Sequence, residues 1–206
     1  MKDHSEKASV TFYGGAGTVT GANFLLDAGD VKILFDCGAL EREHVCDTSN
    51  GMPFAYDPRS IDVLVVTHAH ADHIGRIPKL VHDGFKGVIY STAATRDLAE
   101  LMFEDAIKVM EMDVERHGCE MIYQKEDAAA ALTLWRTQDY HAPFEVGSAT
   151  IEFFDAGHIL GAAMARCTRG GRSILFTGDL GNSPSLLLPS SSPDKTPSTT
   201  SKNFLT

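Results

Sequence analysis

Short runs of apolar residues recur along most of the chain, and Gly, Asp or Ser bounds each of them. Runs of this length that are rich in Val, Ile, Phe and Leu are typical of β-strands. We therefore predict strands at residues 9–14, 22–27, 31–36, 62–66, 87–90, 150–155 and 173–178. Only Ala-Gly-Asp separates the second run from the third, so these two are expected to form a β-hairpin.

Between these runs, three stretches repeat apolar residues with the period of an α-helix. The first is apolar at positions 74, 77, 80 and 81, which predicts a helix over 74–83 that stops near Gly84. The second is predicted to begin at a Thr95 cap and end at Gly118, and a third is predicted to follow Asp127. Helices mixed with strands and a hairpin favour a layered α/β sandwich over a purely parallel sheet.

The composition changes abruptly after Asp179. Ser, Pro and Thr make up 14 of the 21 residues in 182–202. Such a stretch cannot bury enough apolar surface to offset the entropy lost on ordering. The sequence therefore predicts one domain over residues 1–182 and a disordered tail over residues 183–206.

The net charge of −10 argues against a broad nucleic-acid-binding surface, which is normally basic. It is compatible with a polyanionic substrate that metal ions hold locally. The sequence contains neither a run of 18 apolar residues nor an apolar signal segment in its first residues, MKDHSEKASV. We therefore expect a cytoplasmic protein that has no membrane partner.

The four cysteines are widely scattered and form no CxxC pair, which argues against a cysteine-rich zinc site. Without an export signal, disulfides are not expected either. The sequence thus predicts four reduced and mostly buried thiols, at Cys37, Cys46, Cys119 and Cys167.

Three histidines and an aspartate crowd into residues 68–73, HAHADH, one residue after the apolar run 62–66. In extended backbone, residues i and i+2 project to the same side, so His68 and His70 can reach one cation. Asp72 and His73 follow where a helix is predicted to begin, and their side chains point back toward the strand end. Imidazole and carboxylate ligands without thiolate suit Zn²⁺, with Mn²⁺ or Fe²⁺ as alternatives. The segment therefore predicts a site for two adjacent divalent ions.

Two other predicted strand ends provide further ligands. His158 lies in a Gly-flanked loop after 150–155, and Asp179 follows 173–178. A carboxylate at Asp179 can bridge two ions roughly 3.5–4 Å apart. Asp36, at the end of the strand 31–36, is a candidate to accept the free ring N–H of a ligand histidine. The alternative for Asp36 is an ordinary aspartate in a turn.

Taken together, FDCG, HAHADH, DAGH and TGD resemble, in this order, four motifs of the metallo-β-lactamase superfamily. GGAGTVTGANFLL, THAHADHIGRIPKL, YSTAATRDLAELMFEDA and DAGHILGAA resemble its β-CASP branch of RNA-processing nucleases. The resemblance covers about residues 9–182. It implies an αββα sandwich with a dizinc site at one edge.

The resemblance also implies a role for each predicted ligand. His68, His70 and His158 would hold one zinc, Asp72 and His73 the second, and Asp179 would bridge the two. Asp36 would contact a metal ligand and not the metal itself. The implied reaction is hydrolysis of RNA phosphodiesters by a metal-bound hydroxide, in which Asp72 and Asp179 are the catalytic carboxylates.

The chain departs from the branch after Asp179, where β-CASP proteins continue with an inserted domain and two later histidines. This chain has no histidine after His158. We therefore expect a truncated sandwich and a weaker second zinc site, as in a fragment or a disrupted reading frame, and both an active and an inactive chain are left open. Two alternatives are a thioester or lactone hydrolase of the same superfamily and a non-catalytic metal-binding subunit. Such a subunit would pair with a full-length relative or with a second copy of this chain.

Overall fold

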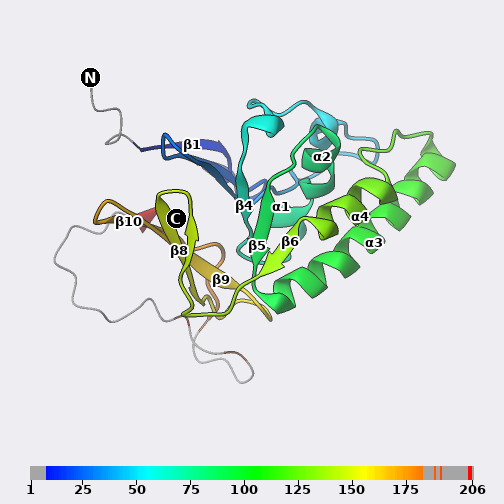
Figure 1. Cartoon of the computed structure of the whole chain (residues 1–206). Helices are drawn as coiled ribbons and strands as arrows, with labels where there is room; N and C mark the ends of the chain where they lie inside the picture. The colour runs from blue at the N-terminus through cyan, green and yellow to red at the C-terminus, as the bar shows by residue number, and fades with distance from the viewer. Residues whose placement is uncertain (1–7, 183–187, 189–190, 192–203, 206) are drawn as a thin grey trace.

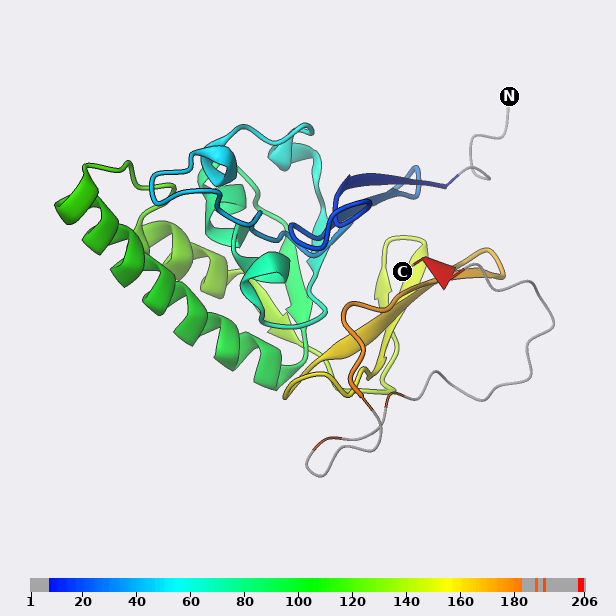
Figure 2. The ribbon, with the colours of Figure 1, turned by 180° about the vertical axis from the view of Figure 1, so that it is seen from behind.

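The computed structural model describes residues 8–182, 188, 191 and 204–205, and in this part of the chain two β-sheets pack face to face. Helices lie against the outer face of the first sheet, and the second sheet lies on its other side (Figure 1). The view from behind shows the same order of layers (Figure 2). The predicted α/β sandwich is confirmed, and the described residues form three of its layers: helices, sheet and sheet.

The first sheet has the strand order β1-β2-β3-β4-β5-β6. Its strands are β1 (Ser9–Gly14), β2 (Asn23–Asp27), β3 (Lys32–Phe35), β4 (Val63–Val65), β5 (Val88–Ser91) and β6 (Trp135–Thr137). β2 and β3 form the predicted hairpin, while β3 to β6 run parallel. Because parallel strands end at the same edge of a sheet, the residues that follow β3 and β4 lie close together there.

The second sheet has the strand order β11-β10-β9-β8-β7. Its strands are β7 (Phe144–Val146), β8 (Ala149–Asp155), β9 (Ala163–Arg169), β10 (Arg172–Phe176) and β11 (Phe204–Leu205). The amide of Ala163, at the start of β9, donates to the carbonyl of Thr67 at 2.8 Å. This hydrogen bond holds the loop between β8 and β9 against the end of β4 in the first sheet.

The described residues contain four α-helices: α1 (Ala71–Ile74), α2 (Ile77–His82), α3 (Ala93–His117) and α4 (Lys125–Thr133). The helix predicted over 74–83 is confirmed over 77–82, but its start is wrong, because Ile74 belongs to the separate helix α1. Pro78 lies in the first turn of α2, where a missing N–H is tolerated. In a continuous helix the same ring would clash with the carbonyl of Ile74.

The second predicted helix starts earlier than expected. The side chain of Thr92, and not that of Thr95, caps α3 by accepting the N–H of Thr95. The helix ends at Gly118 as predicted, with a φ of 69°. α4 begins just before Asp127, whose carboxylate accepts the Gln124 N–H in a capping box. Within the described part of the chain, no helix is both long and apolar enough to cross a membrane.

The core has two main parts, one on each face of the first sheet. On β3, Leu34 packs toward the helices, whereas Ile33 and Phe35 pack toward the second sheet. This alternation follows from the period of two in a strand. Phe35 stacks on Phe176 of β10 with 3.7 Å between ring centroids, so the two sheets are held in contact near the ends of their strands.

All seven predicted strands overlap with observed ones, but β6, β7, β9 and β11 were not predicted. β6 and β7 are only three residues long. β9 reads AMARCTR, and its alanines have little intrinsic preference for strands. Ala163 and Ala165 are nevertheless buried between the sheets. The predicted disordered tail, 183–206, is wrong at Phe204–Leu205, which form β11 and pair in parallel with β10. Apart from these and residues 188 and 191, the tail lies outside the described residues.

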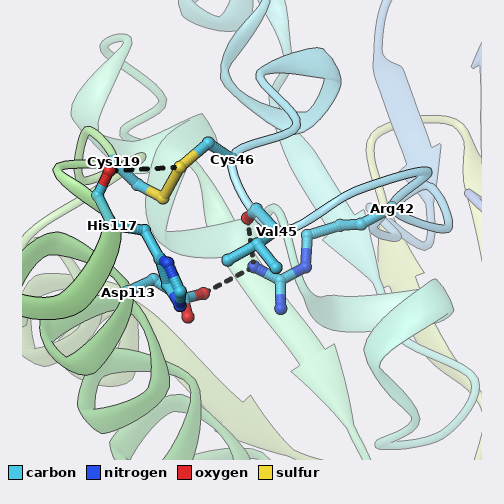
Figure 3. Close-up of a disulfide and its surroundings, with 6 residues drawn as sticks. All are labelled: Arg42, Val45, Cys46, Asp113, His117 and Cys119. Carbon is cyan, nitrogen blue, oxygen red and sulfur yellow. Dashed lines mark hydrogen bonds and ion pairs between the residues drawn. A yellow bond between two sulfur atoms is a disulfide. The ribbon is translucent and has the colours of Figure 1, made fainter.

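The prediction of four reduced thiols is wrong, because Cys46 and Cys119 form a disulfide (Figure 3). Their Cα atoms lie 5.2 Å apart although 73 positions separate them in the sequence. Only the fold brings the loop after β3 to the end of α3, so the spacing of the cysteines gave no signal. Cys37 and Cys167 are free and buried, as predicted.

An ion pair lies beside the disulfide. Nη1 of Arg42 lies 2.8 Å from Oδ2 of Asp113 on α3 and also donates to the carbonyl of Val45 (Figure 3). The disulfide and the ion pair therefore join the same two segments, the loop after β3 and the last turns of α3.

Candidate metal centre

Strand ends from both sheets place the predicted ligands around one point. His68 and His70 follow β4, His158 lies between β8 and β9, and Asp179 follows β10. The structure brings together all six side chains that were predicted to hold metal. They form two groups whose ligand atoms lie within 4.8 Å of one another: His68, His70, His158 and Asp179, and Asp72, His73 and Asp179.

The backbone of residues 68–74 explains how one short segment can serve both groups. His70 is extended, with φ −73° and ψ 150°, and caps the single turn of α1. The carbonyls of residues 71, 72 and 73 accept the amides of Ala39, Ala22 and Cys37 at 2.8–2.9 Å. Gly38 allows this close contact, since a Cβ there would lie 1.6 Å from the carbonyl oxygen of Asp72. Hydrogen bonds from these three amides thus fix the turn that carries Asp72 and His73.

The first group consists of three imidazoles and one carboxylate. Nδ1 of His70 lies 3.1 Å from Nε2 of His68 and 3.1 Å from Nε2 of His158. Oδ2 of Asp179 lies 3.5 Å from Nε2 of His158 and 3.8 Å from Nε2 of His68. Four donor atoms therefore surround a single point.

The second group lies on the other side of Asp179. Oδ1 of Asp179 is 3.4 Å from Nε2 of His73, and Oδ2 of Asp72 is 3.8 Å from the same nitrogen. The two oxygens of Asp179 thus face different groups. Among the described residues, this second group has three donors against four in the first.

The donor atoms fit divalent cations. A tetrahedral zinc with Zn–N distances of roughly 2.0–2.1 Å separates its ligand atoms by about 3.3–3.4 Å. The 3.1 Å and 3.5 Å separations in the first group lie close to that value. Neutral imidazoles have one N–H each, so three ring nitrogens that face one another need a cation or a proton between them. The group suits a metal better than it suits an internal hydrogen-bond network.

The two groups differ in protonation. Burial, reinforced by the neighbouring histidines, lowers the pKa of His68 to about 2, so its ring is neutral. Burial also lowers the pKa of His158. Burial alone would lower the pKa of His73, but the carboxylates of Asp36, Asp72 and Asp179 outweigh it and raise this pKa to about 9. A cation in the second group must therefore displace a proton from His73.

Asp36 lies behind the ligands with its side chain 1% exposed. Its φ of 57° is unusual for a residue other than glycine. Its Oδ2 accepts the ring N–H of His73 at 2.8 Å, the kind of contact suggested by the sequence. The amide of Thr67 donates to Oδ1, and its hydroxyl donates to Oδ2, both at 2.8 Å. Thr67 was not predicted to be part of the site; its position directly before the first histidine is the one feature of the sequence that points to it.

The loop that carries His158 is anchored by the start of α3. The hydroxyls of Thr92 and Thr95 donate to the carbonyl of Gly161 at 2.7 and 2.9 Å. Gly161 has a φ of 83°, and a Cβ there would lie 2.6 Å from the Thr95 nitrogen. The loop therefore passes too close to the helix for any residue larger than glycine. Neither threonine was singled out from the sequence as part of the site.

A small pocket of about 110 Å³ opens beside the second group. Asp36, His73 and Asp179 form its polar side. Its apolar side contains Phe12 and Phe24, whose rings meet edge to face with centroids 5.6 Å apart. Aromatic surface is therefore available next to the proposed cations.

Comparison with known proteins gives the following relationships. A family model described as "Metallo-beta-lactamase superfamily" matches residues 17–203. The chain is 38% identical to "Ribonuclease TTHA0252" of Thermus thermophilus, over 86% of this chain and 39% of that protein. It is 34% identical to "Transcription termination factor FttA" of Methanosarcina mazei, over 82% and 27%. It is 33% identical to "Cleavage and polyadenylation specificity factor subunit 3-I" of Arabidopsis thaliana, over 80% and 23%.

The chain thus spans between 23% and 39% of the length of these three relatives. Among solved structures, it is similar to the metallo-beta-lactamase fold protein YhfI of Bacillus subtilis, with a TM-score of 0.52 and 21% identity. That similarity covers 84% of this chain and 62% of YhfI. At this level of identity, the likeness shows the fold alone.

Proposed function

Because this chain belongs to the metallo-β-lactamase superfamily, in the branch of the β-CASP RNA nucleases, we propose that it is a metal-dependent hydrolase of RNA phosphodiesters. The superfamily and the branch are those that the sequence motifs predict. The observation that supports hydrolase chemistry, beyond membership of the family, is the position of Asp179, which directs one oxygen toward each donor group. A bridging carboxylate of this kind is what a two-metal hydrolase requires.

We propose zinc as the metal, with manganese as the alternative, because the donors are imidazoles and carboxylates without thiolate. When bound, two such ions supply Lewis acidity at the phosphate and a water that is easily deprotonated. The first group would hold its ion through neutral imidazoles. The second would hold its ion more weakly, because the described part of the chain gives it three donors and it must first release a proton from His73.

The chain's own residues have distinct tasks in this proposal. Asp179 sets the distance between the two groups. The carboxylate of Asp72, which is 28% exposed, would accept a hydrogen bond from the attacking water and orient it. Asp36 keeps the ring proton of His73 on Nδ1, so that Nε2 is free to act as a ligand. Each task relies on position, which the fold fixes in advance.

RNA is the substrate best supported by the relatives, since their names describe a ribonuclease and a cleavage and polyadenylation factor. The charge of −10 makes a purely electrostatic grip on RNA unfavourable, so metal ions would have to hold the phosphate. The exposed Phe12, which lines the same pocket as Asp179, offers a face on which an unpaired base can stack. Both features fit a single-stranded RNA.

A second candidate function is a non-catalytic metal-binding subunit that pairs with a full-length relative or with another copy of itself. Among the residues that the structure describes, the second group has three donors, which favours this candidate, since one further ligand from a partner would complete it. In that case the isolated chain would bind one zinc well and turn over no substrate.

The test is a substrate panel with added Zn²⁺ or Mn²⁺. The proposal predicts cleavage of labelled single-stranded RNA and no hydrolysis of hydroxyacyl-glutathione, a lactone or a cephalosporin. EDTA and His70→Ala should abolish cleavage, whereas His117→Ala, at an exposed histidine on α3, should leave it unchanged. Hydrolysis of a thioester or lactone without RNA cleavage would overturn the proposal. Metal binding without any turnover would favour the non-catalytic subunit.

A further inference from the structure

The hydroxyl of Thr67 lies between two of the histidines that face the proposed cations. Oγ1 of Thr67 is 2.8 Å from Oδ2 of Asp36 and 3.1 Å from Nδ1 of His68. Oδ2 of Asp36 is in turn 2.8 Å from Nδ1 of His73. These atoms form one continuous chain of hydrogen bonds from His68 to His73, and Thr67 and His68 at one end of it are both buried.

The direction of each hydrogen bond follows from the number of protons available. A carboxylate only accepts, so the single hydroxyl proton of Thr67 points to Asp36. The hydroxyl oxygen can then only accept from His68, which places the ring proton of His68 on Nδ1. Nε2 of His68 is left with a free lone pair, and this is the nitrogen that faces His70 and Asp179.

We propose that Thr67 is a positioning residue that sets the tautomer of His68 and, through Asp36, couples the two metal groups. His68 belongs to the first group and His73 to the second, so one hydroxyl and one carboxylate orient a ligand in each. The inference rests on the metal binding of the proposed function and not on its RNA substrate.

The local backbone is built around this hydroxyl. A Cβ at Gly178 would lie 2.7 Å from Oγ1 of Thr67, so only glycine fits there. The Thr67 amide also donates to Asp36, and its carbonyl accepts from Ala163 of the second sheet. The backbone of Thr67 is thus held by Asp36 and Ala163, and its hydroxyl oxygen also lies 3.4 Å from Nδ1 of His73.

The test compares Thr67→Val, which keeps the shape and removes the hydroxyl, with Thr67→Ser, which restores it. Zn²⁺ affinity is measured by competition with a chromophoric chelator. Thr67→Val should bind the first zinc roughly 10- to 100-fold more weakly than wild type, and Thr67→Ser should recover most of that loss. Thr150→Val is the matched control, because it makes the same substitution at a threonine of β8 whose hydroxyl donates to Glu145 and to no predicted ligand. Its zinc affinity should stay at the wild-type value.

A second measurement does not depend on the variants folding. Long-range ¹H–¹⁵N spectra of the metal-free wild-type chain should show the ring proton of His68 on Nδ1. A proton on Nε2, or wild-type zinc affinity in Thr67→Val, would overturn the inference. A wild-type chain that binds no zinc would instead overturn the proposed function. In that case the tautomer of His68 would still show whether Thr67 sets it.

Discussion

Oδ1 of Asp179 lies 3.4 Å from Nε2 of His73, although Asp179 follows β10 of the second sheet and His73 belongs to α1, which follows β4 of the first sheet. The other oxygen of Asp179 faces His158 at 3.5 Å. One carboxylate therefore contacts both donor groups. It can do so because the sandwich places the strand ends of its two sheets next to each other.

The two donor groups should bind metal with unequal affinity. Counting the described residues alone, the first has four donors and two histidines whose pKa values are lowered, whereas the second has three donors and a histidine with a pKa raised to about 9. Titration of the metal-free chain with Zn²⁺, followed by native mass spectrometry, should show one tight and one weak ion. Two ions of equal, tight affinity would contradict this interpretation of the second group.

Asp36→Asn should weaken zinc binding by about 10- to 100-fold. Asparagine tolerates the left-handed backbone at this position, so the fold should be kept. Its amide would donate to Nδ1 of His73 and move the ring proton to Nε2, the ligand atom. The pKa of His73 should also fall below about 9, because the largest favourable charge is lost.

The control for Asp36→Asn is Asp105→Asn, at an exposed position on α3. It changes the net charge equally and should leave both zinc affinity and the His73 titration unchanged. Equal zinc affinity in the two variants would show that Asp36 is an ordinary aspartate in a turn.

Thr95→Val should cost about 1 kcal/mol in the free energy of unfolding, since it removes one buried hydrogen bond to Gly161. Because Gly161 follows His158 closely, zinc affinity should fall as well. Urea unfolding and the zinc competition assay measure the two effects. Thr133→Val, at an exposed threonine on α4, should change stability by less than about 0.5 kcal/mol. Lost stability with unchanged zinc affinity would contradict the anchoring role of Thr95.

The disulfide between Cys46 and Cys119 should stabilise the oxidised chain. Closing a loop with a sequence separation of 73 is worth up to about 4 kcal/mol on a chain-entropy model. The double variant Cys46→Ser with Cys119→Ser should therefore unfold at lower urea concentration than the oxidised wild type. Reductant should lower the stability of wild type to that of the variant and leave the variant unchanged. If reductant left the stability of the wild type unchanged, this would contradict the presence of the disulfide.

The two free thiols should be unreactive in the folded chain. Burial raises the pKa of Cys37 and of Cys167 to about 12, from an ordinary value of 9.0. A thiol reagent at pH 8 should label neither in native protein and two thiols per chain after unfolding without reductant. Above pH 9 the thiols ionise in the unfolded chain first, so stability should fall as the pH rises from 9 toward 12. Stability that stays constant over that range would contradict their burial.

Much of the fold was predictable because its strands are short, strongly apolar and punctuated by glycine and aspartate. The hairpin β2–β3 and all seven predicted strands required only local information. β9 was missed because its alanines fill a narrow space between the sheets, which no local pattern reveals. The break between α1 and α2 was predictable in principle from Pro78, which cannot occupy a helix interior.

The candidate site likewise has residues that the local sequence predicts and residues that it does not. HAHADH was recognisable because its ligands lie within six residues, and His158 and Asp179 because each follows an apolar strand. The bond of Thr95 to Gly161 and the contact of Thr67 with Asp36 join residues far apart in the sequence. The same is true of Cys46 and Cys119. Only the packed structure brings such pairs together, and the sequence around each gives no sign of the partner.

The most direct test of the metal centre is a crystal structure of the chain with Zn²⁺, with diffraction data recorded at the zinc absorption edge. We expect two anomalous peaks roughly 3.5–4 Å apart, with the carboxylate of Asp179 between them. One peak should lie within bonding distance of His68, His70 and His158, and the other within bonding distance of Asp72 and His73. Zinc bound elsewhere, or a first site that lacks any one of those three histidines, would contradict the account.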